Sequence, residues 1–281
     1  MCTPIGRMSS GLSPVVRSTR SQTCAGMCRA SSELRARRSP MRVSSRSCRR
    51  CRAHRDDVRP DATEDDDVYE PPFPDTEEIR EDTYGPLKVA SEQEVRSAFG
   101  DRALVVRPGI IVGPHDPTDR FTYWVRRIAA GGEVLAPAPP DYPAQWIDAR
   151  DLAAFLLSLC ERGVGGTYSV VTPPIPIEEL LTTCREAGGS EAALTWVSKA
   201  FLDEHGVEPW SDLPLWIPEY PGLNRFNATR AVAAGLQTRS LASTVSDTLA
   251  WDRGREQTWP MEAGLTPGRE AELLAAWHAR A

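Results

Sequence analysis

The sequence beyond residue 80 predicts an α/β protein, and two observations favour this class. Apolar segments of strand length, such as 103–107 and 167–171, alternate with segments of helix length. Several of the helix-length segments end at glycine, the residue that most often closes a helix, as at Gly100, Gly163 and Gly188. The chain shows no internal repeat. This alternation is typical of an α/β fold.

The first expected element is a helix capped by Thr83, with Pro86 in its first turn, which runs to about Phe99 and ends at Gly100. A loop rich in Trp and Pro is expected at 205–226. The other expected elements, in chain order, are a strand at 103–107, a helix at 119–130, a short strand at 145–148, a helix at 150–162, a strand at 167–171, a helix at 177–187, a short strand at 195–198, and helices near 228–234, 241–253 and 266–280.

The first 60 residues differ in composition from the rest of the chain. They contain 14 Arg, no Lys and three acidic residues, whereas the 281 residues together carry a net charge of -6. Neither helical nor strand periodicity is sustained in this segment. It buries too little apolar surface to offset its ordering entropy, so we expect a disordered N-terminus. Residues 61–82 are acidic and rich in Pro, which predicts a surface loop.

Composition also argues against several classes of protein. No apolar run has the length of a membrane span, and no secretory signal is present. Five of the seven Cys lie in the first 60 residues, and the other two are isolated. We therefore expect no disulfide framework, and we expect a cytoplasmic location. The acidic charge of residues 61–281 would repel a phosphate backbone, which argues against a nucleic-acid partner.

Tyr84 and Lys88 are the residues most informative about chemistry. Side chains four residues apart lie on one face of a helix. An ammonium group beside a phenol favours its ionised form, so the tyrosine can act as an acid/base closer to neutral pH. A solvated surface pair on a helix has the same spacing, so the pair alone is a weak signal.

Three further segments follow this pair in order. They are the strand and loop Val106-Arg107-Pro108-Gly109-Ile110-Ile111-Val112-Gly113-Pro114, the segment Gln145-Trp146-Ile147-Asp148-Ala149-Arg150-Asp151-Leu152-Ala153, and the strand Thr167-Tyr168-Ser169-Val170. Together with the Tyr-x-x-x-Lys pair, they resemble the extended short-chain dehydrogenase/reductase superfamily, the NAD-dependent epimerase/dehydratase group. The resemblance implies a partial NAD(P)-binding Rossmann-like fold, with an incomplete parallel sheet, and an α/β substrate-binding region.

The resemblance also implies roles for particular residues. In the family the tyrosine exchanges a proton with the substrate oxygen, while the lysine lowers the pKa of the tyrosine and holds the nicotinamide ribose. Tyr84 and Lys88 are therefore the expected catalytic residues, and Lys88, Arg107, Pro108 and Ile110 the expected cofactor contacts. The implied cofactor is NAD or NADP, the implied partner is a small-molecule substrate, and no metal is expected.

The loop at 115–124 lies where the family binds its substrate. The forked guanidinium of Arg120 can clamp a carboxylate or a phosphate. In the competing interpretation, Asp119 caps a helix and Arg120 is solvated. Trp124 and Trp146 either form the wall of a substrate pocket or pack in the core.

The front half that such an enzyme needs is not recognisable. No strand followed by Gly-x-x-Gly-x-x-Gly occurs, and this is the motif that brings the backbone close to the cofactor pyrophosphate. The leading hypothesis is that residues 1 to about 55 are translated out of frame or from a misplaced start. The alternatives are a transit peptide, a basic arm for nucleic acid, and a zinc site formed by Cys24, Cys28, Cys48 and Cys51.

These observations divide the chain into residues 1–60, disordered; residues 61–118, a remnant of the dinucleotide-binding domain with the catalytic helix; and residues 119–281, mainly the substrate-binding region. The expected function is that of an NAD(P)-dependent oxidoreductase or epimerase/dehydratase, inactive as written because the cofactor-binding half is lost. The alternatives are a non-catalytic binding protein of the same superfamily, with an RNA or protein partner, and a degraded product. Whether the chain forms a homodimer is left open.

Overall fold

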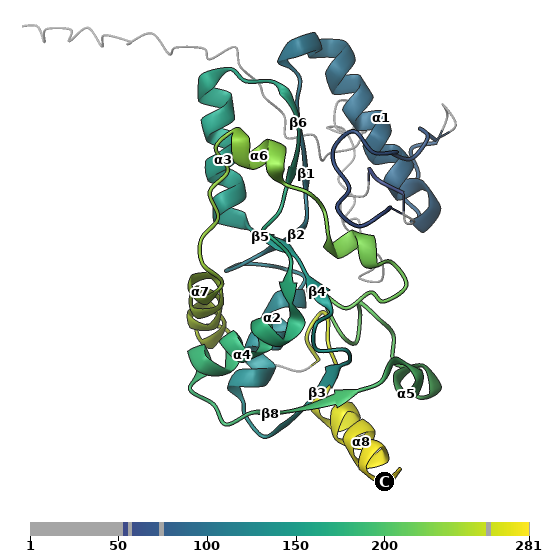
Figure 1. Cartoon of the computed structure of the whole chain (residues 1–281), viewed down its shortest axis with the longest axis vertical. Helices are drawn as coiled ribbons and strands as arrows, with labels where there is room; N and C mark the ends of the chain where they lie inside the picture. Colours follow the sequence, from purple (N-terminus) through teal and green to yellow (C-terminus); the bar gives the residue numbers. More distant parts are fainter. Residues whose placement is uncertain (1–52, 56–57, 73–75, 257–259, 281) are drawn as a thin grey trace, which may run out of the picture.

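The computed structural model describes residues 53–55, 58–72, 76–256 and 260–280 (Figure 1). Residues 1–52 are outside this range. The predicted disorder of the N-terminus and the four cysteines considered for zinc therefore lie outside the described residues. No helix in the described part of the chain combines the length and the apolar character that crossing a membrane requires.

A parallel pair of strands with helices on both sides forms one end of the molecule (Figure 1). Strand β1 (Leu104–Pro108) pairs in parallel with β6 (Gly166–Val170). Helix α1 (Glu81–Phe99) lies on one side of this pair, and α3 (Ala149–Arg162) and α6 (Thr229–Ala233) lie on the other. Parallel strands are usually covered on both faces, and here apolar residues of α3, α6 and β6 form a small core.

The chain passes from this pair into two shorter strand pairs. Strand β2 (Ile110–Val112) pairs in parallel with β5 (Trp146–Asp148), and β4 (Pro143–Ala144) pairs antiparallel with β7 (Ile175–Pro176). Gly109 joins β1 to β2 at a close approach, because a Cβ atom there would lie 2.8 Å from Cγ1 of Val171. Only glycine fits at this junction without a shift of the neighbouring side chain.

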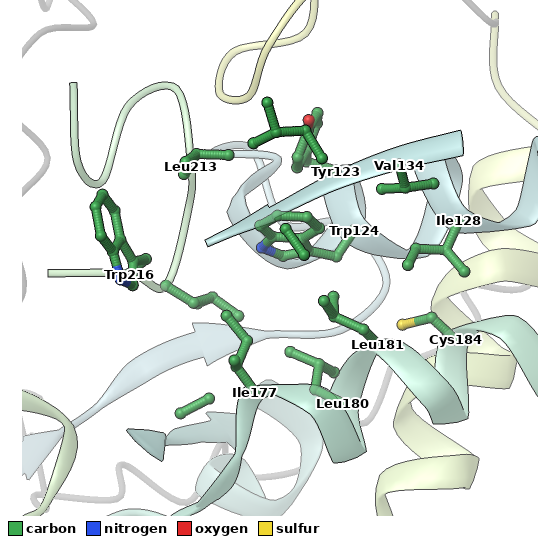
Figure 2. Packing of buried hydrophobic residues seen from close by; sticks show 14 of the residues in the cluster. Tyr123, Trp124, Ile128, Val134, Ile177, Leu180, Leu181, Cys184, Leu213 and Trp216 are labelled. Carbon is green, nitrogen blue, oxygen red and sulfur yellow. The ribbon is translucent and has the colours of Figure 1, made fainter. Parts of the chain in front are cut away.

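The other end of the molecule holds the larger core. Strand β3 (Glu133–Pro137) pairs in parallel with β8 (Ala193–Val197). The helices around this core are α2 (Arg120–Ala129), α4 (Ile177–Gly188), α5 (Lys199–Glu204), α7 (Leu241–Arg253) and α8 (Pro267–His278). Figure 2 shows Trp124 of α2 among Ile177 and Leu181 of α4 and Leu213 of the loop after α5, all of them fully buried.

The predicted α/β fold with an incomplete parallel sheet is confirmed, since its parallel strands form separate pairs. Its Rossmann-like character stays a prediction. Each helix and strand predicted from the sequence is present, with bounds that differ by a few residues. The start of α1 differs from the prediction, since the helix begins at Glu81 and Thr83 is its third residue. The Thr83 hydroxyl still serves the helix start, because its oxygen accepts a hydrogen bond of 2.8 Å from the backbone N–H of Arg80. Pro86 lies in the second turn, not the first.

Residues 61–72, in the predicted surface loop at 61–82, form a loop, but part of this loop is buried and not at the surface. Ala62 is fully buried and forms a bridge with Phe226, and the backbone N–H of Asp61 donates to the carbonyl of Arg225. The carboxylate of Glu64 accepts a hydrogen bond of 2.6 Å from the backbone N–H of Ser169 in β6. This acidic segment therefore packs against the sheet, which its composition did not indicate.

Candidate active site

Tyr84 and Lys88 lie one turn apart in the N-terminal half of α1, as their spacing predicts. The Lys88 ammonium is 5.2 Å from the centroid of the Tyr84 ring. Both side chains are half-buried. A cation at this distance interacts favourably with the aromatic ring and with any negative charge on its phenol oxygen. The structure thus brings together the two predicted catalytic residues, and their role in catalysis stays a prediction.

A buried ion pair fixes α1 against β1. The Arg107 guanidinium donates two hydrogen bonds to the Glu92 carboxylate, of 2.9 Å from Nε and 2.8 Å from Nη2. Both side chains are buried. Glu92 lies one turn after Lys88, so this bidentate pair holds the helix that carries the catalytic candidates.

The remaining terminal nitrogen of Arg107 contacts the segment that precedes α1. Nη1 donates to the carbonyl of Glu64 at 3.1 Å and lies 3.1 Å from Nε2 of His54. Arg107 thus has partners within the protein for its whole guanidinium. Its predicted contact with a cofactor stays a prediction.

The contacts of His54 indicate which of its two ring nitrogens carries the hydrogen. Its Nδ1 lies 3.1 Å from the carbonyl oxygen of Asp67, which can only accept, so Nδ1 carries the hydrogen. Its Nε2 faces an Arg107 nitrogen, which can only donate, so Nε2 carries the lone pair. Burial, then the charge of Arg107, lower the pKa of His54, and they outweigh the Asp67 carbonyl and the charges of Glu92 and Asp66.

We expect the protein to lose stability as the pH falls below about 6.5, the ordinary pKa of histidine. Because the pKa of His54 is lower in the folded protein, the unfolded chain binds a proton first. The free energy of unfolding should therefore be level above this pH and decline below it. Urea denaturation at a series of pH values measures this decline. The variant His54→Gln, which keeps a donor and an acceptor but does not titrate there, should lose the decline between pH 5 and 7; an unchanged pH dependence would count against the assignment.

Pro108 and Ile110 lie on either side of the β1–β2 junction. Pro108 ends β1 opposite Val170 and is half-buried, whereas Ile110 begins β2 and belongs to the larger core. Their predicted contacts with a cofactor are not tested by this placement.

Arg120 is the first residue of α2, and it is buried. Its guanidinium carbon lies 4.6 Å from the centroid of the Trp210 ring. Asp119 occupies the cap position, but its side chain forms no capping hydrogen bond and instead accepts one of 2.6 Å from Arg255. The interpretation in which Asp119 caps the helix through its side chain and Arg120 is solvated is therefore wrong.

Trp124 and Trp146 both belong to the larger core. Trp124 is fully buried, and its indole nitrogen donates a hydrogen bond of 2.8 Å to the carbonyl of Pro214. Trp146 lies in β5 with its ring centroid 5.7 Å from that of Phe121. These placements favour the packing interpretation of the two residues over the pocket-wall interpretation.

Sequence reasoning missed a polar cluster at the start of α3. Asp148 caps this helix by accepting from the backbone N–H of Arg150, and it also accepts from the Arg150 guanidinium and the Thr244 hydroxyl. Burial raises the pKa of Asp148, but these hydrogen bonds outweigh burial and the net shift is downward. Arg239 donates to Asp151 of the same helix. The Asp-Leu-Ala sequence at the start of this helix was the only signal for the cluster. No sequence pattern indicated its partners Thr244 in α7 and Arg239 in the loop before α7.

The described residues fit one end of a nicotinamide cofactor and not the other. A phenol and an ammonium group on one helix face supply the donors that a nicotinamide ribose and a substrate oxygen require. For the pyrophosphate, a glycine-rich turn opening a helix would be needed. No helix in the described ranges begins with such a turn. Nor do these ranges contain a group of three or more His, Cys, Asp or Glu placed to hold a metal.

Comparison with known proteins shows that the middle of the chain is similar to one protein family. Residues 59–170 match the model of the NAD dependent epimerase/dehydratase family. The matched segment includes α1 with Tyr84 and Lys88, and it extends to the end of β6. No curated protein matches the chain.

Several solved structures are similar to the chain. A structure of RMD from Pseudomonas aeruginosa complexed with NADPH is 18% identical over 61% of this chain and 56% of that one, with a TM-score of 0.45. A dTDP-4-dehydrorhamnose reductase from Clostridium acetobutylicum is 15% identical over 73% and 63%, with a TM-score of 0.48. A UDP-glucose 4-epimerase from Thermotoga maritima is 17% identical over 61% and 53%, with a TM-score of 0.44. This chain thus covers less than two thirds of each of these proteins.

Proposed function

We propose, because residues 59–170 match the model of the NAD dependent epimerase/dehydratase family, that the chain is the catalytic and substrate-binding part of an NAD(P)-dependent reductase, epimerase or dehydratase. The observation that supports this most strongly is the Tyr84–Lys88 pair on α1, inside the matched segment. The proposed substrate is a small polar molecule with a carbonyl or hydroxyl group at the reacting carbon.

The proposed roles of the two residues follow from their chemistry. The Tyr84 hydroxyl donates a proton to the substrate oxygen in reduction and accepts one in oxidation. The Lys88 ammonium stabilises the negative charge left on the phenol oxygen and would hold the hydroxyls of the nicotinamide ribose. NAD(P), when bound, supplies or accepts the hydride.

The structure supports a stable position for this pair. Residues on α1 can hold an acid/base group in place only if the helix itself is fixed to the sheet. The Glu92–Arg107 pair provides this attachment, and Arg96 adds a hydrogen bond of 2.7 Å to the Thr167 hydroxyl of β6. The phenol and the ammonium are therefore presented from a rigid element, as precise proton transfer requires.

We further propose that the chain as written binds NAD(P) weakly and turns over little, because no glycine-rich strand–turn–helix motif occurs in the sequence. A completed chain would carry such a motif, read from the upstream nucleotides in another frame, ahead of residue 56. This part of the proposal explains the change in composition near residue 55.

Titration of NADH and NADPH by fluorescence, into the chain as written and into the completed chain, tests the proposal. The completed chain should bind at least one of the two cofactors with an affinity at least about tenfold higher than the chain as written. Equal, tight binding by the chain as written would contradict the proposed loss. If neither chain bound, a non-catalytic binding protein would be the better account.

A further inference from the structure

The Arg120 guanidinium is buried and forms no hydrogen bond or ion pair with a carboxylate of the described residues. Arg120 is only 8% exposed. Its Nε atom has no access to solvent and no hydrogen-bond partner. Nor does a hydrogen bond or ion pair join the guanidinium to any other residue in the ranges that the structure describes. The guanidinium carbon lies 4.6 Å from the centroid of the Trp210 ring.

The other two arginines of α2, buried Arg126 and half-buried Arg127, show what Arg120 lacks. Arg126 donates two hydrogen bonds to the Asp252 carboxylate, and Arg127 forms an ion pair with Glu270. A buried charge is costly unless it is paired and hydrogen-bonded. Arg126 and Arg127 thus follow this rule within the protein, whereas Arg120 has no such bond to a carboxylate and would form one with a ligand anion.

The N-terminus of α2 adds to the positive potential at Arg120. The first amides of a helix have no partner within the helix, and they carry a partial positive charge. The Asp119 side chain does not cap them, since its two oxygens accept from the Arg255 guanidinium and from the backbone N–H of Glu262. Asp119 itself adopts a left-handed conformation, with φ of 54°.

A carboxyl group beside Arg120 limits the charge of the ligand. Asp116 is buried, and its Oδ1 accepts hydrogen bonds from the Thr118 amide and hydroxyl. Its Oδ2 is buried and has no partner. Burial raises the pKa of Asp116, and it outweighs the Thr118 hydrogen bonds and the charge of Arg120, which lower this pKa.

We propose that Arg120, with Asp116 and the N-terminus of α2, forms a binding site for a carboxylate group of the substrate. One guanidinium matches the single negative charge of a carboxylate, whereas a phosphate dianion beside the Asp116 carboxyl would require further cations. The two oxygens of a carboxylate suit the fork of the guanidinium, whose plane packs over the Trp210 ring. The proposal rests on the proposed function only in assigning this carboxylate to the substrate.

Acetate, inorganic phosphate and chloride at equal ionic strength are the probes, and the Nε–H signal of Arg120 in a nitrogen–proton NMR spectrum is the readout. A buried Nε–H exchanges slowly enough to be observed, and Arg120→Lys identifies its signal by removing it. Acetate should shift this signal saturably, and phosphate should bind at least about tenfold more weakly. No saturable shift with acetate, or tighter binding of phosphate, would overturn the proposal.

Two variants separate the site from general effects on the protein. In Arg120→Lys, acetate binding, followed by saturation-transfer NMR on the acetate methyl group, should weaken at least about tenfold, because a single ammonium cannot donate two parallel hydrogen bonds. Arg253→Lys, an exposed arginine on the neighbouring helix α7, should bind acetate as the parent chain does. Equal affinity in the two variants would contradict the proposal. Because the assay uses neither NAD(P) nor turnover, failure of the proposed function would leave its outcome unaffected.

Discussion

Replacement of Tyr84 by Phe in the completed chain is expected to lower turnover by about 10²- to 10⁴-fold, the usual contribution of a general acid/base. Phe keeps the ring, so its packing on α1 and its contact with Lys88 are preserved. The change removes only the hydroxyl that exchanges the proton. The expected loss should therefore appear in the rate of the chemical step and leave the stability of the protein nearly unchanged.

The rate of NAD(P)H oxidation, on a carbonyl substrate found by screening, measures this effect. Tyr220→Phe provides a matched control, because Tyr220 is also half-buried but lies in the loop before residue 221, outside the matched family segment. Its turnover should stay within about twofold of the parent chain. Equal turnover of the two variants would remove Tyr84 from the mechanism.

Replacement of Glu92 by Gln is expected to lower the free energy of unfolding by about 3–5 kcal/mol. The change leaves the buried Arg107 guanidinium without its carboxylate, although it keeps the size of the side chain. The cost arises from an uncompensated buried charge. Denaturation with urea, followed by circular dichroism, gives this value from the shift of the midpoint.

Two further variants distinguish the ion pair from a general effect on α1. Glu94→Gln removes an exposed carboxylate from the same helix and should change the free energy of unfolding by less than about 0.5 kcal/mol. The double variant Glu92→Leu with Arg107→Met should recover part of the stability lost in Glu92→Gln, because both buried charges are then absent. A loss in Glu94→Gln as large as that in Glu92→Gln would show that the pair is not the cause.

The local parts of the fold could be predicted from the sequence. Helix α1 ends at Phe99, because Gly100 follows it, and α4 ends before a left-handed Gly189. Strand β3 and the six-residue helix α5 were not predicted. β3 follows two glycines and ends at a proline. Its partner strand, β8, lies about 60 residues further along the chain. Such strands depend on partners that a local pattern does not specify.

The same distinction applies to the candidate site. The Tyr84–Lys88 neighbourhood follows from helical spacing alone and was predictable. The Arg107 network was not, because its partners Glu92, Glu64 and His54 are 15, 43 and 53 residues away. The burial of Arg120 on Trp210 likewise depends on a loop that follows α2 by about 80 residues. Long-range contacts of this kind decide which charged side chains are structural and which are open to a ligand.

The affinity of the completed chain for NADH, compared between Lys88→Met and Lys199→Met, tests the central claim most directly. These are the only two lysines in the sequence. Lys88 lies beside Tyr84 on α1, whereas Lys199 begins α5, where it is paired with Asp203 and Glu219. We expect Lys88→Met to weaken binding at least about tenfold, through loss of its charge-assisted hydrogen bonds to the ribose, and Lys199→Met to leave it unchanged. Equal affinities in the two variants would contradict the assignment of the Tyr84–Lys88 pair to the nicotinamide site.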